Sequence, residues 1–445
     1  NYLYQKVSMQ QPISGFSKRN KAEKIKWIVE QHFEDPKAAA ALLTSYSHPD
    51  ASVQEKHDEF IENTLSNFYL PMGVAPNFLI NGRYYTLPMV IEESSVVAAA
   101  GKAAKYWADR GGFRTTILGM EKVGQIHFLC SEKSDIVQAF FESAKKTLIR
   151  SCAPLLERME KRGGGLLDLQ LIDKTAALAD YYQLHATFDT QDAMGANFIN
   201  SVLEQLAEQL LIASRDYPAF AAQEQPVEVV MSILSNYVPN CLVRAEVRCP
   251  VTELEAEDNL TPEAFAQKVI QAVQIAQVEP YRAVTHNKGI MNGIDAVVLA
   301  TGNDFRAIEA GIHAYAARDG HYRSLTKAFI ENETFVFQMD LPLAVGTVGG
   351  LTQLHPMVKW SLELLQNPSA RELMQIIAVA GLAQNFAAIR SLVTSGIQQG
   401  HMKMHLLNIL NQLDASAEQK EQAIEFFKTN AVSHSAVQAF LTSKA

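Results

Sequence analysis

The sequence predicts a multidomain protein of mixed α+β and α/β fold. Its 445 residues, 48% of them hydrophobic, exceed what one small domain needs and suggest two or three domains. Apolar residues at helical spacing alternate with short strand-like runs along most of the chain. Residues 114–250 differ from the segments on either side because their strands come partly in pairs, which is typical of an antiparallel α+β unit.

The first part of the chain begins with helices and continues into a hairpin. Apolar spacing predicts helices over residues 22–33 and 53–65. Residues 77–90 are apolar on both sides of Asn81-Gly82, a strong signal for a two-residue hairpin turn. The Ala-rich segment 92–108 predicts a helix that ends at Gly111-Gly112.

The rest of the chain alternates between strands and helices. Thr261-Pro262-Glu263 supplies an N-cap, a proline at the first helical position and an early acid, which together predict a helix start. Residues 367–445 read as almost wholly helical. The other predicted strands are 115–118, 125–129, 166–172, 182–188, 241–247, 296–300 and 335–343, and the other helices are 135–162, 195–213 and 306–318.

Composition argues against several classes of protein. A net charge of −9 disfavours a general nucleic-acid binder, because phosphate binding needs a basic surface. The four cysteines form no CxxC pair, so we expect no disulfide framework and infer a reducing, cytoplasmic compartment. No run of about 18 apolar residues occurs, so we expect no transmembrane helix and no membrane partner.

Three polar positions are candidates for catalysis. Glu92 and Glu93 open the helix after the hairpin; they either complement its dipole, or one is buried and kept protonated as a proton donor. Lys288, beside Gly289, is either a solvated loop lysine or a cation that stabilises an oxyanion. Asp304 either caps the next helix or holds Lys288 charged and oriented.

Two further segments have the residues to contact a cofactor or move a proton. Residues 192–197 (DAMGAN) place small residues before a helix, which lets its N-terminus meet a phosphate, although an ordinary Asp-capped start fits as well. The chain has no GxGxxG, which disfavours a standard Rossmann dehydrogenase. His401 and His405 share a helix face without an evident third ligand, so we expect no metal; His401 is either a surface histidine or a general acid on a mobile segment.

Taken together and in this order, these segments resemble the hydroxymethylglutaryl-CoA reductase family, specifically its soluble bacterial class II branch. The resemblance runs from about Glu62 to His401. It rests on PMVIEESSVVAAA from Pro88, DAMGAN from Asp192, THNKGIMNGIDAVVLATGND from Thr285 and GIQQGHM from Gly396.

The resemblance implies a role for each matching residue. The catalytic residues would be Glu93, Lys288, Asp304 and His401. The substrate contacts would be Ser95, Arg282, Asn292, Asn236 and, on the CoA side, Gln384. The nicotinamide cofactor, NADPH or NADH, would be bound by Asp192, Ala193, Met194, Gly195, Ala196 and Asn197.

The resemblance also implies an architecture. A large domain, residues 1–113 and 240–395, would bind the CoA substrate. An inserted ferredoxin-like domain, residues 114–239, would bind the dinucleotide, and a C-terminal helical flap, residues 396–445, would carry the catalytic histidine. The family builds its active site across a subunit interface, so we expect a homodimer.

The implied activity is the two-step, four-electron reduction of 3-hydroxy-3-methylglutaryl-CoA to mevalonate and free CoA with two NAD(P)H, or the reverse oxidation. Lys288 would stabilise the oxyanion, His401 would protonate the CoA thiolate, and Glu93 would protonate the new alcohol. Residues 157–162 include both acidic and basic side chains, and we expect this segment to decide between NADPH and NADH. Our preference is NADPH. The alternative function is a catalytically silent homologue that binds CoA or a nucleotide.

Two departures from the family pattern concern the backbone. Residues 62–66 read ENTLS where the family commonly has ENVIG, and Ser94 stands where bacterial members commonly have proline. Losing glycine and proline changes local stiffness, so we expect an effect on substrate affinity rather than on reaction type.

Overall fold

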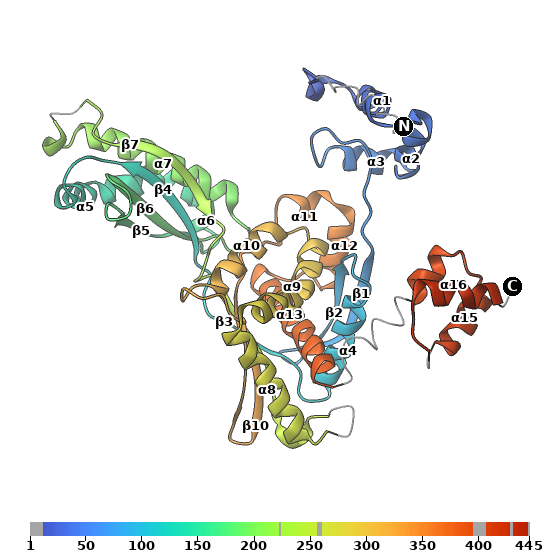
Figure 1. Cartoon of the computed structure of the whole chain (residues 1–445). Helices are drawn as coiled ribbons and strands as arrows, with labels where there is room; N and C mark the ends of the chain where they lie inside the picture. Colours follow the sequence, from blue (N-terminus) through green and yellow to red (C-terminus); the bar gives the residue numbers. More distant parts are fainter. Residues whose placement is uncertain (1–11, 222–223, 256–259, 395–405, 428–429, 444–445) are drawn as a thin grey trace, which may run out of the picture. The chain divides into compact units, whose positions relative to one another are not determined.

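The computed structural model describes residues 12–221, 224–255, 260–394, 406–427 and 430–443 (Figure 1). The chain divides into two compact units, one ending at Pro71 and the other beginning at Met72. Strands and helices are mixed throughout the second unit, which confirms the predicted mixed fold class.

The first unit is helical. A 3-10 turn, Phe16–Lys18, precedes α1 (Lys21–His32), α2 (Pro36–Ser45) and α3 (Ala51–Asp58). The three helices begin at polar N-caps, namely Asn20, Asp35 and Asp50. The helix predicted to reach residue 65 stops at Asp58. The chain then turns at Asn63, whose φ is 60°, and the Thr64 hydroxyl donates to the Asp58 carbonyl oxygen.

The second unit opens with the predicted hairpin, formed by β1 (Met72–Ile80) and β2 (Arg83–Val90). Its turn residues Asn81 and Gly82 have φ values of 49° and 82°, as the tight hairpin turn requires. The helix α4 (Val96–Ala108) follows and packs on β1. The hairpin and α4 therefore place the Glu92-Glu93 segment between a strand and a helix.

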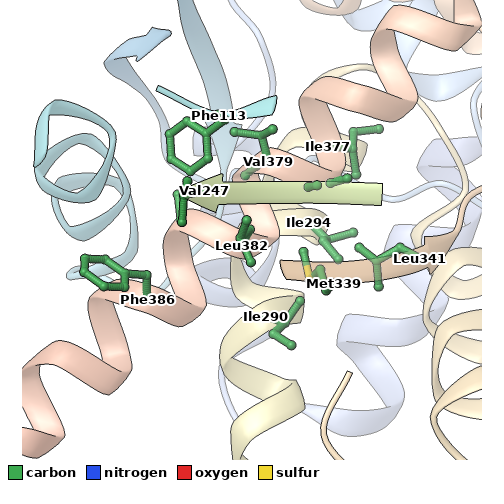
Figure 2. Close-up of a cluster of buried hydrophobic side chains, with 14 of the residues drawn as sticks. Phe113, Val247, Ile290, Ile294, Met339, Leu341, Ile377, Val379, Leu382 and Phe386 are labelled. Atoms are coloured by element: carbon green, nitrogen blue, oxygen red, sulfur yellow. The ribbon is translucent and has the colours of Figure 1, made fainter. Parts of the chain in front are cut away.

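A four-stranded antiparallel sheet lies in the main hydrophobic core. Its order is β3 (Arg114–Ile117), β8 (Leu242–Pro250), β10 (Thr334–Pro342) and β9 (Thr326–Glu331). The helix α13 (Ala370–Val393) packs on β8 and against α4 and α9 (Pro280–Ala300). Figure 2 shows Ile294 of α9 and Leu382 of α13 beside Val247 and Met339 of the two central strands.

Among the described residues, α13 is the one helix long and apolar enough to cross a membrane by length and composition. Most of it is buried inside the protein, where it contacts α9, α4 and the central sheet. A helix that is apolar all round is expected wherever protein surrounds it, so its composition is explained by its place in the core.

A second sheet has its own hydrophobic core. Its order is β5 (Gly165–Asp173), β6 (Tyr181–Asp189), β4 (Lys122–Leu129) and β7 (Glu228–Ser235), with all neighbours antiparallel. Three helices accompany it: α5 (Ser134–Ser151), α6 (Ala153–Glu160) and α7 (Ala196–Arg215). The chain order strand, helix, strand, strand, helix, strand is that of a ferredoxin-like unit. The single helix predicted over 135–162 is divided at Cys152, two residues before Pro154 in the first turn of α6.

The remaining helices are α8 (Pro262–Val278), α10 (Phe305–Ala316), α11 (Leu351–Leu354), α12 (Pro356–Leu364), α15 (Ala417–Phe426) and α16 (His434–Ser443). The helix α8 starts at the predicted N-cap, Thr261. Residues 406–412 are also helical, and Leu410, Phe427 and Phe440 belong to a small core shared with α15 and α16.

The strand predicted at 296–300 is wrong, and so is the loop predicted around Lys288. Both segments belong to the single helix α9. The apolar run at its end is buried in the core, where Ala296, Val297 and Val298 are inaccessible to solvent. A short buried helical segment has the same continuous apolar pattern as a buried strand, so the sequence pattern did not distinguish the two.

Gly293 allows α9 to approach α13 closely, and a side chain there is expected to weaken the fold. A Cβ atom at Gly293 would lie 2.4 Å from the carbonyl oxygen of Ala380. We expect Gly293→Ala to lower the free energy of unfolding by about 1–3 kcal/mol, measured by chemical denaturation. The matched control is Gly289→Ala on the same helix, whose nearest neighbour atom would be 4.0 Å away. It should stabilise the fold by about 0.5–1 kcal/mol, and equal effects of the two changes would contradict this account.

Asp295, on α9, makes the stability of the fold depend on pH. Burial, together with a hydrogen bond and charge repulsion from Glu309 on α10, raises the pKa of Asp295 from 3.8 to about 8. The folded state keeps a proton that the unfolded state releases near its ordinary pKa, so stability falls as pH rises between these two values.

We therefore expect Asp295→Asn to melt at a higher temperature than the parent protein at pH 8. Calorimetry should show this difference shrinking as the pH falls toward and below 3.8, because the parent carboxyl then becomes neutral in both states. The control Asp319→Asn removes an exposed carboxyl and should give no such trend. An Asp295→Asn effect of the same size at both pH values would contradict the burial argument.

Candidate active site

A cavity of about 440 Å³ lies among α4, α9 and α13. Glu93 is the one acid among its described lining residues. The cationic lining residues are Lys102, Arg282, Lys288 and Arg390. This excess of positive charge favours an anionic ligand.

Glu93 and Lys288 meet at the edge of this cavity. The Lys288 Nζ lies 2.8 Å from the Glu93 Oε2 and donates a hydrogen bond to it. The Asn292 Nδ2 lies 3.5 Å from the same oxygen. Lys288 and Asn292 are four residues apart on α9 and therefore share one helix face. An ammonium, an amide and a carboxylate are thus gathered within one small volume, although 195 residues separate Glu93 from Lys288.

The segment between β2 and α4 turns one carboxylate of the Glu92-Glu93 pair toward the cavity. Glu92 is exposed, whereas Glu93 lines the cavity with 35% of its side chain accessible. The helix begins after both residues, at Val96, and its N-cap Ser95 makes no side-chain capping bond. The predicted burial of Glu93 is not found in the single chain, where the carboxylate is paired with Lys288 instead.

Arg282 lies on the same helix as Lys288 and also faces the cavity. Burial lowers the pKa of its guanidinium below the usual value. None of the described acidic side chains forms an ion pair with it, and Glu279 instead accepts a hydrogen bond from its backbone nitrogen. A half-buried guanidinium with no ion-pair partner in the described part of the chain is suited to a carboxylate ligand, because it presents two parallel donors to two oxygens.

The wall contributed by α13 carries Gln384. Its side chain is 6% exposed, and its Oε1 atom has no hydrogen-bond partner among the described residues. Buried amides are normally satisfied, so this oxygen is available to a donor on a ligand. Gln384 therefore lies where the sequence placed it, at the cavity with Ser95, Arg282 and Asn292.

Two predicted site residues lie outside this cavity in the single chain. Asp304 is the N-cap of α10, where its carboxylate accepts from the backbone nitrogens of Arg306 and Ala307. The α9 helix extends about 18 Å from Lys288 to its last residue, given 1.5 Å per residue, and Asp304 follows that end. Asn236 lines a separate small hollow. His401 lies outside the described residues.

The predicted cofactor segment forms a turn before α7. Gly195 is the N-cap with φ of 96°, and none of the described side chains accepts a hydrogen bond from the first backbone N–H groups of this helix. The carboxylate of Asp192 accepts from the backbone nitrogen of Ala370, and its carbonyl oxygen accepts from Thr347. The uncapped N–H groups suit a phosphate, whereas Asp192 anchors the turn to the first residue of α13.

Some residues of these sites were not predicted from the sequence. Lys102 and Arg390 line the cavity, and Lys122 lies beneath the turn before α7. Each is a single lysine or arginine in a helix or strand, and no local motif distinguishes it from a solvated surface charge. Their positions become evident only when distant segments pack together.

Comparison with known proteins places the chain in a family. A family described as hydroxymethylglutaryl-coenzyme A reductase matches residues 16–406. The 3-hydroxy-3-methylglutaryl-coenzyme A reductase of Archaeoglobus fulgidus is 36% identical over 422 residues, which cover 94% of this chain and 91% of that protein.

Solved structures support the same family. The class II 3-hydroxy-3-methylglutaryl-CoA reductase from Streptococcus pneumoniae, bound to NADPH in open conformations, superposes with a TM-score of 0.70 at 39% identity and covers 86% of this chain and 100% of that one. Another structure of the Streptococcus pneumoniae reductase gives a TM-score of 0.71 at 38% identity and covers 97% of this chain and 100% of that one. The chain therefore belongs to the hydroxymethylglutaryl-coenzyme A reductase family, in its class II branch.

Proposed function

We propose that this protein reduces 3-hydroxy-3-methylglutaryl-CoA to mevalonate and free CoA, using two equivalents of reduced nicotinamide cofactor. The observation that carries this proposal is the Glu93–Lys288 pair, held at 2.8 Å beside a cation-lined cavity. Family membership supplies the reaction type, and the cavity supplies a place for its anionic substrate.

The substrate carboxylate is proposed to bind Arg282 and Ser95. Arg282 has no carboxylate partner among the described residues, and Ser95 has an uncommitted hydroxyl at the start of α4. Gln384 offers its unpaired Oε1 to the CoA portion. The thioester carbonyl then lies near Lys288 and Asn292, between the two ends of the bound molecule.

The turn at residues 192–197 fits a dinucleotide. An added Cβ at Gly195 would lie 2.5 Å from the Thr190 side chain, so a glycine keeps this turn tight, and the α7 N–H groups stay open for the pyrophosphate. When bound there, the reduced nicotinamide supplies one hydride to the thioester carbonyl and a second to the aldehyde that follows. We propose NADPH as the preferred cofactor, because the Streptococcus pneumoniae relative was solved with it.

The chain's own residues move protons and stabilise charge. Lys288 has three N–H donors, of which Glu93 accepts one, so others remain to stabilise the carbonyl oxygen as negative charge develops. His401 is proposed to protonate the sulfur of the departing CoA. Glu93 is proposed to deliver the final proton to the alcohol oxygen, which requires that substrate displace it from its ion pair with Lys288.

We also propose a homodimer in which Asp304 completes the partner's site. Asp304 follows the far end of α9 from Lys288, which supports a site in which a second copy brings the two side chains together. The helices α11 and α12 pack against Gly302, two residues before Asp304, and carry the exposed apolar side chains Leu354, Met357 and Trp360. Apolar side chains of this kind are typical of the buried centre of a dimer interface.

A second candidate function is a catalytically silent homologue that binds CoA or a nucleotide. The Glu93–Lys288 geometry argues against it, because a binding protein has no need to hold a carboxylate and an ammonium together beside the cavity. The intracellular setting is proposed to be the cytoplasm, since all four cysteines are free and buried.

Lys288→Ala tests the oxyanion role. Removing this donor should lower kcat about 100–1000-fold, while the KM for the CoA substrate changes little. The assay follows oxidation of NADPH in the presence of 3-hydroxy-3-methylglutaryl-CoA. The control Lys105→Ala removes an exposed lysine of α4 that does not line the cavity and should keep the parental rate. A near-parental rate for Lys288→Ala would contradict the assignment.

Mixing two inactive variants tests the shared site. In a dimer formed from one Lys288→Ala and one Asp304→Asn chain, one site carries both changes and the other carries neither. Random exchange of subunits should therefore restore about a quarter of parental activity. Half of the dimers are then mixed, and each mixed dimer has one intact site out of two. If Lys288 and Asp304 came from the same chain, no site would be intact and mixing would restore nothing.

A further inference from the structure

Lys122 is a buried lysine that the reaction scheme does not use. It is the first residue of β4 and is 2% exposed. Its ammonium donates to the Thr190 hydroxyl and, at 2.7 Å, to the carbonyl oxygen of Ala193. The Thr190 hydroxyl also donates to that carbonyl at 2.6 Å. Lys122 and Thr190 therefore close the turn at 190–193 from the side of the second sheet.

This turn leads directly into the proposed cofactor segment. Gly195 packs against Thr190 so closely that no other residue fits without a shift. On the other side, Asp192 accepts hydrogen bonds from Thr347 and Ala370 of the main core, and Ala193 forms a bridge with Val348. The turn is thus fixed from two directions, and Lys122 supplies the anchor on the sheet side.

A structural role alone explains Lys122 poorly. Burial lowers the pKa of Lys122, and the nearby Cys241, Asp189 and Asp192 oppose that shift. An ammonium is costly to bury, and no carboxylate within hydrogen-bonding distance compensates it among the described residues. An apolar side chain of similar length would fill the same space at lower cost. Such an apolar side chain would not, however, supply a charged donor to the carbonyl oxygen of Ala193.

We propose that Lys122 is a positioning residue for the cofactor site: through Thr190 and Ala193 it fixes the turn, and thereby the direction in which α7 presents its N–H groups to the dinucleotide phosphates. The inference rests on the proposed function, in which residues 192–197 bind the cofactor. It assigns Lys122 no contact with cofactor or substrate, so its loss acts on cofactor affinity rather than on the chemical step.

The test compares the affinity of the full-length protein for NADPH, measured by ligand fluorescence, with the kinetic constants. Lys122→Met and Thr190→Val should each raise the Kd of NADPH about 10-fold or more, because each removes a hydrogen bond of the charged donor. Thr190→Ser keeps the hydroxyl and should stay close to the parent. The KM for the CoA substrate should not change in any of these variants.

One control and one pair of variants that does not depend on Lys122 make the outcome decisive. Lys145→Met removes a lysine that pairs with Asp168 in the same sheet unit, away from the turn, and should bind NADPH as the parent does. If Lys122→Met does not fold, the Thr190→Val and Thr190→Ser pair still decides the question. Folded Thr190→Val with parental NADPH affinity, or an equal rise in the KM for the CoA substrate, overturns the inference. A parent protein that binds neither NADPH nor NADH overturns the proposed function as well.

Discussion

The ion pair between Glu93 and Lys288 is the interaction on which the site depends. The two residues reach each other only because α9 packs against both the hairpin strand β2 and the helix α4. A salt bridge this exposed contributes little to stability by itself. The buried helix contacts therefore set the position of the pair, and the pair in turn marks the place where a carbonyl oxygen can be stabilised.

The helix α9 serves as the common scaffold of the proposed reaction. Its exposed face carries Arg282, Lys288 and Asn292 along the cavity, while Ile290 and Ile294 are buried in the core. Close contact with α13 at Gly293 fixes the helix laterally. Groups that act on one carbonyl must be held with little freedom, and a helix packed on several sides provides that rigidity better than a loop. The cofactor turn is anchored in a comparable way, from the second sheet and from the main core.

Local signals explain why much of the fold was predictable. Asn81-Gly82 specified its hairpin, Thr261-Pro262 specified a helix start, and paired strands indicated the α+β unit. The C-terminal part of α9 was misread because its apolar run fits a buried strand equally well. The cavity residues Ser95, Arg282, Lys288, Asn292 and Gln384 were named in advance through family resemblance. Lys122 was not, because its significance lies in contacts with residues 68 or more positions away.

The most direct test of the central claim is a double-mutant cycle on kcat/KM with Glu93→Gln, Lys288→Ala and the double variant. If the two side chains act as a unit on one carbonyl, the second substitution should cost little once the first is made, and the losses will be strongly non-additive. If the double variant lost kcat/KM by the product of the two single losses, as independent residues do, the account would be contradicted.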